Sequence, residues 1–507
     1  MAAAMAAAAN KVSLLSLVLL VLLCWGSPSA SQELRRPPSK IGVIGAGIGG
    51  TSAAYFLRQK FGRDVQIDVF EKGDVGGRLA TLNVEGKHYE AGGAIIHPLN
   101  LHMKHFAKVL GLSVSPIQDG LMGFYNGDEL VFEESGWYIW NFIKLLWHYG
   151  LNALRMYLWE EEILDKFMRI YRYQSHNYAF STSEALLHAL GGSDFLRRLN
   201  QTMDEALQEA GFSQKFINEF VTPVLRYNYG QSTSINGLVG VIALASIDPG
   251  LWSIEGGNKL ACAGLLEASK AQLIPSTVLS LEEKNRQEGR SGGVVKLYKV
   301  EYNSAAGLTS DLYDIVVIAT PLQRKISNLE FRNFKLPSGE FSRPYQPIVS
   351  TLVHGQINAS LFGYQDPSQL VLSDIFTTEG PKAFFYSLSL VSPVQNKMDQ
   401  SLVSPVWRTF SAESLTKEQL NLLFSSYDTV EEKKWLAYPR YSPPEKPSPV
   451  VLHDHVYYVN SIEWVASAME MSAISAKNIA LLAYHRWYNK AHMIDQEDLH
   501  ERLKTEL

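Results

Sequence analysis

The chain has 507 residues, of which 46% are hydrophobic and 19% charged, and its formal net charge is −5. This composition is typical of a folded protein with a large buried interior, and the length predicts two or three globular units rather than one core. No run of Lys and Arg exceeds a few residues, which argues against a nucleic-acid partner, because phosphate binding requires clustered basic side chains.

The N-terminal segment 1–31 has the pattern of a secretory signal peptide. Lys11 precedes the apolar run Leu14–Cys24, and small residues follow up to an expected cleavage after Ser29 or Ser31. An uncleaved anchor is the alternative, although the apolar run is shorter than the ~20 residues that a membrane span requires.

Further features of the sequence fit a secretory route. Cleavage would remove Cys24 and leave Cys262 as the only thiol, so no intramolecular disulfide is expected and Cys262 is interpreted as an inert core residue. Asn200 and Asn358 begin glycosylation sequons. The chain ends in KTEL, one residue away from a retrieval signal of the endoplasmic reticulum, and an ordinary polar tail over 491–507 is the alternative.

The stretch Lys40–Gly50 (KIGVIGAGIGG) predicts a strand, a glycine turn and the start of a helix. Gly45, Gly47 and Gly50 form G-x-G-x-x-G, which permits a tight turn, close approach of the backbone to a pyrophosphate, and packing of helix on strand. The helix N-terminus would add free N–H groups and a positive dipole end. The expected cofactor contacts here are Gly45, Ala46, Gly47, Ile48, Gly49 and Gly50.

The next predicted strand, DVQIDVFEK, ends at Glu71, which follows Gly50 by 21 residues. A carboxylate at this place accepts hydrogen bonds from both ribose hydroxyls and repels a 2′-phosphate. Lys72 is included with Glu71 among the expected cofactor contacts. Strand, glycine turn, helix and acidic strand end together predict a Rossmann-like dinucleotide-binding unit.

Two more glycine elements follow this unit. GGRLAT contains Gly76, Gly77 and Arg78, and HYEAGGAIIHP contains Gly92 and Gly93. An ordinary glycine hairpin is the alternative interpretation of each.

The segment Trp137–Trp159 is rich in aromatic and aliphatic residues, and its polar residues form one narrow helical stripe. Three interpretations stay open: a buried core helix, the wall or mouth of a channel for an apolar ligand, and a face that rests on lipid. The polar stripe argues against a membrane-spanning helix. The stripe consists of Asn141, Lys144, His148, Asn152 and Arg155.

The elements typical of nucleotide binding fall into three separated pieces, 40–100, 245–325 and 450–490. The predicted architecture is therefore α/β, with a discontinuous Rossmann-like domain and an α+β substrate domain formed by the insertions 101–244 and 326–449. Neither an internal repeat nor a long low-complexity segment interrupts this pattern.

The glycine elements and their spacing resemble the flavoprotein superfamily of amine oxidases, phytoene desaturases and Rab escort proteins. The strand-like segment YDIVVIATP (Tyr313–Pro321) resembles the strand that closes the FAD domain there. The resemblance implies FAD as cofactor. Its implied contacts are Gly77 and Arg78 near the pyrophosphate, Gly92 and Gly93 near the flavin ring, and Val278 beside the adenine.

The segment YYVNSIEWVASAMEMSAISA occupies the place of the amine-oxidase segment that covers the flavin, and Glu463 is the expected contact there. Ser461 replaces the glycine of the Tyr-x-x-Gly-Glu pattern, and Glu463 is shifted by one residue, so the chain departs from a standard amine oxidase. No Cys or His stands where those relatives attach the flavin, and the FAD is therefore expected to be non-covalent.

The insertions carry a closer resemblance. VFEESGWYIWNFIKLLWHYG, EEILDKFMRIYRYQSHNYAFS, NYGQSTSING and LWSIEGGNKL together resemble the prenylcysteine oxidase (prenylcysteine lyase) family, from about Lys40 to the C-terminus. The resemblance implies an FAD-dependent thioether oxidase. Such an enzyme converts farnesyl- or geranylgeranyl-cysteine and molecular oxygen to cysteine, an isoprenoid aldehyde and hydrogen peroxide. It also implies a lysosomal location reached through the secretory pathway, with secretion as the alternative.

This chemistry is reasonable from first principles. C1 of the prenyl chain is allylic and next to sulfur, so positive charge is stabilised there while flavin N5 accepts a hydride, and water then adds to give a hemithioacetal that collapses. No strong general base is required before hydride transfer. His97, beside the EAGGA element, is the candidate catalytic residue, and Tyr229 and Glu255 are weaker candidates. The histidines lack metal-ligand spacing, so no metal is predicted.

Two other functions remain as alternatives. One is an FAD oxidase of another lipophilic thioether or amine. The other is a non-catalytic carrier of prenylated ligands, because Rab escort proteins share this architecture, although the intact loop with Glu71 and Arg78 argues against it. Peripheral membrane contact is expected only on the lipid-face interpretation above, and the sequence leaves the oligomeric state open.

Overall fold

The computed structural model describes residues 35–117, 120–288, 293–305, 307–337, 341, 343–395, 405–497 and 499. From residue 38 onward, the described residues form one compact unit. The predicted signal peptide and the KTEL end lie outside the described residues.

A six-stranded sheet gathers strands from distant parts of the chain. All neighbouring strands are parallel except the edge pair β20–β21. In spatial order the strands are β20 (Val451–His453), β21 (Val456–Tyr458), β13 (Ile315–Ile318), β1 (Lys40–Ile44), β2 (Gln66–Glu71) and β9 (Gln272–Pro275).

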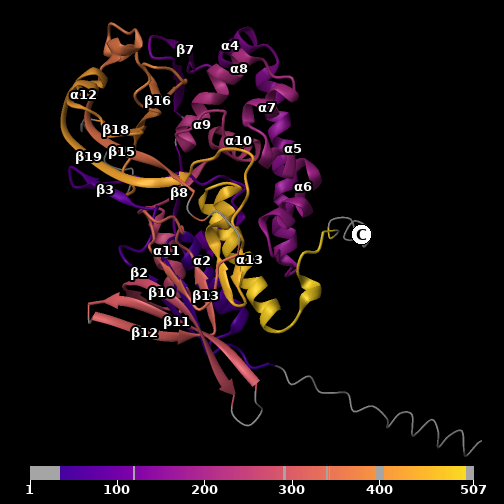
Figure 1. Ribbon diagram of the computed structural model, residues 1–507. Coiled ribbons are helices and arrows are strands. Elements are labelled where there is room, and N and C mark those ends of the chain that lie inside the picture. The colour runs from indigo at the N-terminus through magenta and orange to yellow at the C-terminus, as the bar shows by residue number, and fades with distance from the viewer. Residues whose placement is uncertain are drawn as a thin grey trace, which may run out of the picture. The chain divides into compact units, whose positions relative to one another are not determined.

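The central strands β1, β13 and β21 are mostly buried apolar runs because both of their faces are covered. Ile41 and Val43 of β1 pack on the side of three helices, α2 (Ile48–Phe61), α11 (Lys259–Ser269) and α13 (Met469–Trp487). Ile44 packs on the other side, against residues of a four-stranded sheet. Figure 1 shows α2 and α13 side by side near the centre of the unit.

The covering sheet consists of β12 (Gly307–Tyr313), β11 (Gly293–Ser304), β10 (Thr277–Glu288) and β14 (Glu330–Arg332). With the six-stranded sheet and the helices it makes a three-layered Rossmann-like domain, so the prediction of an α/β fold with such a domain is confirmed. The exact boundaries proposed from the sequence stay a prediction.

A seven-stranded sheet lies outside the nucleotide-binding layers. In spatial order its strands are β19 (Phe424–Pro439), β15 (Tyr345–Ile357), β18 (Val406–Ser411), β17 (Ser387–Val391), β16 (Leu372–Thr377), β6 (Leu121–Tyr125) and β7 (Leu130–Glu133). The first insertion, 101–244, contributes β6 and β7 to this sheet. Both are short strands: β6 pairs with β16 of the distant second insertion, and β7 pairs with β6 at the edge.

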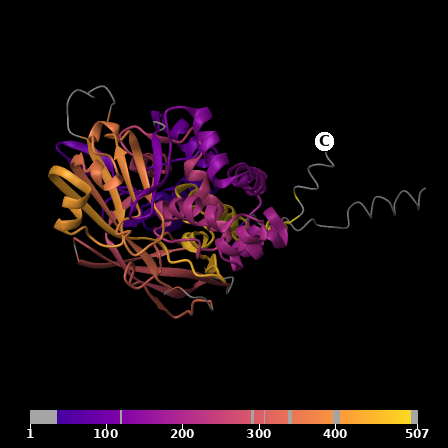
Figure 2. The same cartoon turned by 90° about the horizontal axis from the view of Figure 1, so that it is seen from above.

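Helices of the first insertion pack against this sheet, and Figure 2 shows them in purple and magenta beside the orange strands. Thr182, Thr202 and Asn236 cap the N-termini of three of them with side-chain hydrogen bonds. Helix α3 (Leu101–Val109) packs instead against α13 and α11. The other helices of the insertion are α4 (Tyr138–Tyr149), α5 (Asn152–Ser175), α6 (Ser183–Asn200), α7 (Met203–Glu209), α8 (Gln214–Phe216), the π-helix η1 (Ile217–Val221), α9 (Thr222–Tyr229) and α10 (Gly237–Leu244).

The segment Trp137–Trp159 is not one helix. Gly150, with φ of 61°, ends α4, and α5 begins two residues later. The buried-core interpretation of this segment is wrong for α4, where Tyr149 is the only buried residue and Trp147 is 91% exposed. Within the described part of the chain, no helix combines the length and the apolar character that crossing a bilayer requires.

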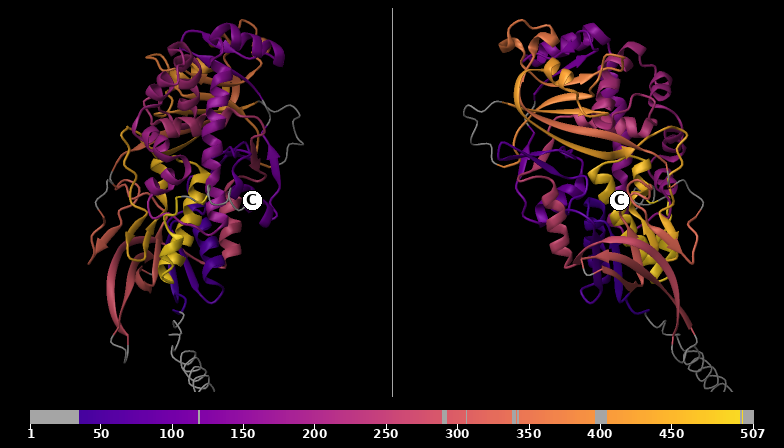
Figure 3. Two further views of the ribbon diagram at one scale, coloured as in Figure 1. Left: turned by 90° about the vertical axis from the view of Figure 1, so that its right-hand side faces the viewer. Right: turned by 60° about the vertical axis from the view of Figure 1, so that its left-hand side comes forward.

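Helix α5 connects two regions of the unit. Its first turns carry the exposed side chains Leu154, Tyr157 and Leu158, and its later turns contact α13. Figure 3 shows α5 running alongside α13 toward the nucleotide-binding layers. The remaining strands and α-helices are β3 (Thr81–Val84), β4 (Lys87–Glu90), β5 (Val114–Pro116), β8 (Trp252–Ile254) and α12 (Lys417–Leu423).

Candidate cofactor and substrate site

The glycine loop is a tight turn between β1 and α2. Gly45 has φ of 107°, a conformation that favours glycine, and its N–H donates to the carbonyl of Phe70 at 2.8 Å. A Cβ at Gly50 would lie 1.8 Å from the carbonyl oxygen of Gly45, so only glycine allows α2 to approach the turn this closely. The loop is therefore built for contact through its backbone.

Glu71, at the end of β2, is attached to the glycine loop. Its Oε2 accepts a hydrogen bond from the N–H of Ala46 at 2.8 Å, and its Oε1 accepts one from the N–H of Gly73 at 2.9 Å. Both bonds fix the carboxylate at the edge of the sheet, where strand ends face a bound ligand in Rossmann-like folds.

Two helix N-termini lie on the same cavity. Gly47 precedes α2 and Ala468 precedes α13, and neither contributes a capping side chain. Their first N–H groups therefore have no partner within the helix, and the dipole makes both ends favourable for negative charge. This arrangement suits an anion such as a pyrophosphate.

The GGR element lies against the glycine loop. Gly76, with φ of 127°, donates its N–H to the carbonyl of Ala46 at 3.0 Å, and it forms a bridge with Gly47. Arg78 beyond it forms an ion pair with Glu463, whose side chain is 1% exposed. The two residues were predicted as separate cofactor contacts, and the fold joins them.

Glu463 is held by several donors besides Arg78. The hydroxyl of Tyr345 donates to it at 2.8 Å, and the amide of Asn460 at 2.7 Å. The carboxylate is fully used in this network and does not line the cavity. Its contribution is to orient Arg78, which also donates to the carbonyl of Ala437 at 2.7 Å.

The EAGGA element approaches the Arg78 backbone. A Cβ at Gly92 would lie 2.0 Å from the carbonyl oxygen of Arg78 and 2.7 Å from the ring of Trp435. A Cβ at Gly93 would lie 2.8 Å from Leu79. These glycines leave a flat backbone surface beside the cavity.

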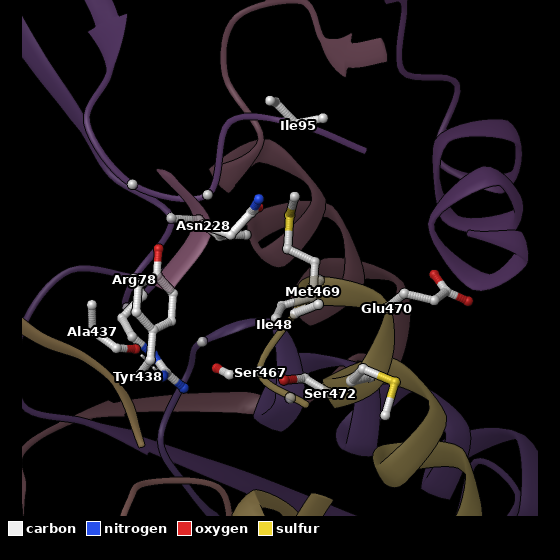
Figure 4. Close-up of a pocket in the computed structure, with 18 of the residues that line it drawn as sticks. Ile48, Arg78, Ile95, Asn228, Ala437, Tyr438, Ser467, Met469, Glu470 and Ser472 are labelled. Carbon is white, nitrogen blue, oxygen red and sulfur yellow. Dashed lines mark hydrogen bonds between the residues drawn. The ribbon is translucent and has the colours of Figure 1, made fainter. Parts of the chain in front are cut away.

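These elements enclose a cavity of about 620 Å³. Figure 4 shows residues of α2, α13, β19 and the GGR element around one space. The sequence-predicted residues that line it are Gly45, Gly47, Ile48, Gly49, Glu71, Lys72, Gly77, Arg78, Gly92, Gly93, His97 and Tyr229. Those that do not line it are Ala46, Gly50, Glu255, Val278 and Glu463.

The part of the cavity away from the glycine loop is largely apolar. Its wall comes from α5, α9, α10, the loop before β8 and the seven-stranded sheet, and sequence reasoning named none of these residues as site residues. The apolar residues of α5 have helical spacing, but this pattern is equally typical of a helix face that packs in the core. The residues are Leu164, Phe167, Met168, Tyr227, Ile242, Leu251, Ile348, Arg408, Phe410, Trp435, Leu436 and Tyr438.

His97 faces the cavity, but both nitrogens of its ring have partners. Nε2 lies 3.1 Å from Oδ2 of Asp248, and Nδ1 accepts the N–H of Leu99 at 3.1 Å. Since Nδ1 accepts a hydrogen bond, the ring proton is on Nε2, which donates a hydrogen bond to Asp248. This imidazole is oriented by its neighbours and has no free lone pair for a substrate proton.

Two buried carboxyl groups lie near this wall. Burial raises the pKa of Glu470 to about 7, against hydrogen bonds from the N–H groups of His102 and Met103. Burial, with a smaller effect of Asp248, raises the pKa of Glu160 to about 8. Oε1 of Glu160 has no hydrogen-bond partner, so this side chain favours its neutral form.

The two sequon asparagines differ in exposure. Asn200 is exposed at the end of α6, whereas Asn358 is half-buried before a short 3₁₀ turn. The side-chain amide of Asn200 donates to Leu196, and that of Asn358 to Leu422. Among the described residues, no group of three or more His, Cys, Asp and Glu side chains could hold a metal ion.

Two family models and several curated proteins match this chain. Residues 132–496 match the family model "Prenylcysteine lyase", and residues 43–110 match "NAD(P)-binding Rossmann-like domain". The chain is 57% identical to "Prenylcysteine oxidase 1" of Bos taurus over 496 residues, covering 97% of each chain. It is 57% identical to the Homo sapiens protein of that name, covering 98% of each, and 46% identical to human "Prenylcysteine oxidase 1-like", covering 93% of this chain and 95% of that one.

Solved structures share the fold at low identity. Cyclohexylamine oxidase from Brevibacterium oxydans IH-35A has a TM-score of 0.58 at 14% identity and covers 89% of this chain and 99% of its own. A putrescine oxidase has a TM-score of 0.56 at 13% identity, covering 87% of this chain and 98% of its own.

Proposed function

The chain belongs to the prenylcysteine lyase family, and from this premise we propose that it is an FAD-dependent oxidase of prenylcysteine thioethers. The overall reaction consumes a farnesyl- or geranylgeranyl-cysteine, molecular oxygen and water. It yields cysteine, the isoprenoid aldehyde and hydrogen peroxide.

The observation that carries the cofactor assignment is the joint placement of the uncapped α2 terminus and Glu71 on one cavity. Free N–H groups suit the pyrophosphate, and a carboxylate that follows the glycine loop suits the ribose hydroxyls. The α13 terminus supplies a second set of N–H groups, and the GGR and EAGGA backbones extend the site. The residues present therefore fit FAD.

We expect the flavin to be bound without a covalent link. Cys262 is the only cysteine among the described residues, and it is fully buried in α11 and does not line the cavity. Burial raises the pKa of its thiol to about 12, which disfavours the reactive thiolate.

When bound, FAD supplies the capacity to accept a hydride from carbon beside sulfur and to pass the electrons to oxygen. The residues of the chain have other tasks. The backbones of Gly92 and Gly93 and the aromatic rings of Trp435 and Tyr438 border the space where the reacting carbon must lie. The apolar side chains around that space exclude bulk water until the oxidation has occurred.

A prenyl chain matches the apolar part of the cavity. Leu164, Phe167 and Met168 of α5 and Ile242 of α10 line it. Burying each methylene of an isoprenoid contributes roughly 0.8 kcal/mol, so this wall can supply much of the affinity for the substrate. A small hydrophilic amine such as a polyamine gains nothing from it. A lipophilic thioether or amine, the alternative substrate, would gain from the same wall.

The test is anaerobic mixing of purified protein with farnesylcysteine while flavin absorbance near ~450 nm is followed. We expect a flavin-containing protein whose absorbance bleaches with farnesylcysteine and recovers when oxygen is admitted, with hydrogen peroxide formed. A colourless preparation that gains no FAD would contradict both oxidase assignments. Bleaching with a polyamine but not with farnesylcysteine would favour an amine oxidase.

We further propose that the chain enters the secretory pathway, carries a glycan and acts in the lysosome. The apolar N-terminal run and the sequons of the sequence support this proposal. Asn200 is the better acceptor because it is exposed on a helix end. Sensitivity of the secreted or lysosomal protein to an N-glycosidase, lost in Asn200→Gln, tests it.

We also propose peripheral contact with lipid through an aromatic patch, defined as Trp137, Tyr138, Ile139, Trp140, Phe142 and Trp147. These side chains are between 52% and 91% exposed. Trp and Tyr prefer the interface between headgroups and hydrocarbon, and a prenylated substrate partitions into bilayers. Helix α5 leads from the end of α4 to the cavity wall, which supports the idea of delivery from lipid.

A further inference from the structure

One arginine of the cavity wall has no acidic partner. Arg408 lies on β18, a central strand of the seven-stranded sheet, and its side chain is buried although it lines the cavity. Among the described residues, no carboxylate oxygen lies within 4.0 Å of its guanidinium. By contrast, Arg78, the other arginine on the wall, is paired with Glu463.

The hydrogen bonds of Arg408 leave donors unused. One terminal nitrogen donates to the carbonyl of Glu90 over a long 3.3 Å, and Nε has no partner. The guanidinium also lies 4.8 Å from the ring centre of Phe410 and interacts with the hydroxyl of Tyr227. A guanidinium has five N–H donors, so several stay available to a ligand.

The nearest acids do not remove this charge. Burial raises the pKa of Glu90 to about 7, and burial also raises the pKa of Asp374, so burial disfavours the charged form of both carboxyls. Arg226, another buried arginine, differs from Arg408 because its guanidinium is hydrogen-bonded within the fold. It donates to the carbonyl and hydroxyl of Thr377 and does not line the cavity.

The position of Arg408 matches the shape of the proposed substrate. It lies among Tyr227, Phe410 and Ile348 of the wall, and its partner Glu90 directly precedes the EAGGA glycines. The α5 wall that suits a prenyl chain comes from a different part of the fold. A cavity with an unpaired cation in one wall and apolar side chains in another suits an amphiphile with an anionic head and an apolar tail.

Resting on the proposed function, we propose that Arg408 binds the α-carboxylate of the cysteine portion of the substrate and makes the enzyme selective for thioethers that carry it. A desolvated guanidinium forms paired, charge-assisted hydrogen bonds with a carboxylate, which fix orientation as well as affinity. Binding the head in this way places the thioether and its C1 at a defined distance along the cavity. The contact also compensates the cost of keeping an unpaired cation buried.

The test compares two substrates, S-farnesylcysteine and S-farnesylcysteamine, which lacks only the carboxylate. We expect the wild-type holoenzyme to favour farnesylcysteine in kcat/KM by about 10- to 100-fold, as charge-assisted hydrogen bonds predict. In Arg408→Gln this preference should fall to near unity through loss of farnesylcysteine activity alone. Arg408→Lys should retain part of it, and Lys434→Gln, an exposed side chain on the nearby β19, should retain all of it.

A binding measurement separates this proposal from the proposed function. The saturated S-alkyl analogues of both compounds lack the allylic position, so calorimetry yields their Kd without turnover. Arg408→Gln should weaken binding of the cysteine analogue by the same factor of about 10 to 100. It should leave the Kd of the cysteamine analogue and the flavin content unchanged. Equal losses for both compounds, or loss of flavin, would overturn the role of Arg408. Selective binding without flavin bleaching by farnesylcysteine would instead overturn the proposed function alone.

Discussion

The N–H of Ala46 donates a 2.8 Å hydrogen bond to the carboxylate of Glu71, which joins the glycine loop to the end of the neighbouring strand. The loop and the acidic residue therefore act as one unit: the carboxylate that would bind the ribose also holds the turn that would bind the pyrophosphate. Losing this side chain removes a ligand contact and a support of the loop together.

Replacing Glu71 should weaken FAD retention. We expect Glu71→Ala to raise the Kd for FAD by about 10- to 100-fold, because a hydrogen-bonded charged group is lost at the ribose. Flavin content after gel filtration and titration of the apoprotein with FAD measure the change. Glu330→Ala, an exposed carboxylate on β14, is the matched control and should retain wild-type flavin. Unchanged flavin in Glu71→Ala would exclude its role at the ribose.

Removing Arg78 should destabilise the protein more than removing both partners of its ion pair. Arg78→Met leaves the carboxylate of Glu463, 1% exposed, without its cation, which costs about 3–5 kcal/mol for a buried pair. The double variant Arg78→Met/Glu463→Gln removes the uncompensated charge and should recover part of that loss. Thermal unfolding shows which of the two variants is less stable, and we expect it to be the single variant. Equal stabilities would show that the pair is not coupled.

The neutral form of Glu160 makes stability depend on pH. Its pKa is raised from 4.5 to about 8, mainly by burial and also by Asp248, so its contribution is fully present below pH 4.5 and is lost as pH rises through 8. At about 1.4 kcal/mol for each pKa unit, the loss amounts to a few kcal/mol. The Tm of the wild type should therefore fall across this range, and the Tm of Glu160→Gln should fall less. Parallel pH profiles would contradict the assignment.

The aromatic patch should govern binding to vesicles. Trp140→Ser/Trp147→Ser should reduce the fraction bound to phosphatidylcholine vesicles by at least about 5-fold, because two interfacial aromatic side chains are lost. Turnover of farnesylcysteine in detergent should stay unchanged. Leu308→Ser, which removes a 65% exposed apolar residue from β12, is the control for a general loss of surface hydrophobicity. Equal vesicle binding by the wild type, the Trp140→Ser/Trp147→Ser variant and Leu308→Ser would exclude the aromatic patch as the site of lipid contact.

Replacing His97 tests the candidate drawn from the sequence. Because its ring nitrogens contact Asp248 and the N–H of Leu99, we expect His97→Asn to act through position and not through proton transfer. The pH dependence of kcat should keep its shape while KM for farnesylcysteine rises a few-fold. A change in the shape of the kcat profile in His97→Asn would instead assign His97 a catalytic proton.

Much of the cofactor side could be predicted because local backbone requirements leave a record in the sequence. Gly45 needs a positive φ, Gly50 needs space against Gly45, and Glu71 ends a strand of fixed length, so each requirement selects a residue type at a fixed spacing. The segment Tyr313–Pro321, which the family resemblance identified as the closing strand of the FAD domain, contains β13.

Other expectations depended on partners that lie far away along the chain. Trp137–Trp159 has the composition of a core helix, yet Gly150 divides it and the fold leaves α4 with an exposed aromatic face. Strands β6 and β7 are too short to be recognised alone, and β6 joins the sheet only through β16 of the distant second insertion. Glu463, predicted as a cofactor contact, pairs with Arg78, which lies 385 residues away along the chain, and nothing in the sequence indicated this pairing.

The sequence by itself determined that a dinucleotide is held, that the chain is a Rossmann-like flavoprotein relative, and which loops contribute their backbones, because these depend on short-range geometry. Only the tertiary structure decided which side chains line the cavity beyond the glycine elements. Arg408 and Trp435 lie on separate strands without a motif, and their chemistry arises when a seven-stranded sheet places an unpaired cation and an aromatic ring on the wall of one cavity. Contacts between distant segments leave no fixed spacing in a single chain, so a substrate site of this kind can be recognised only in the folded protein.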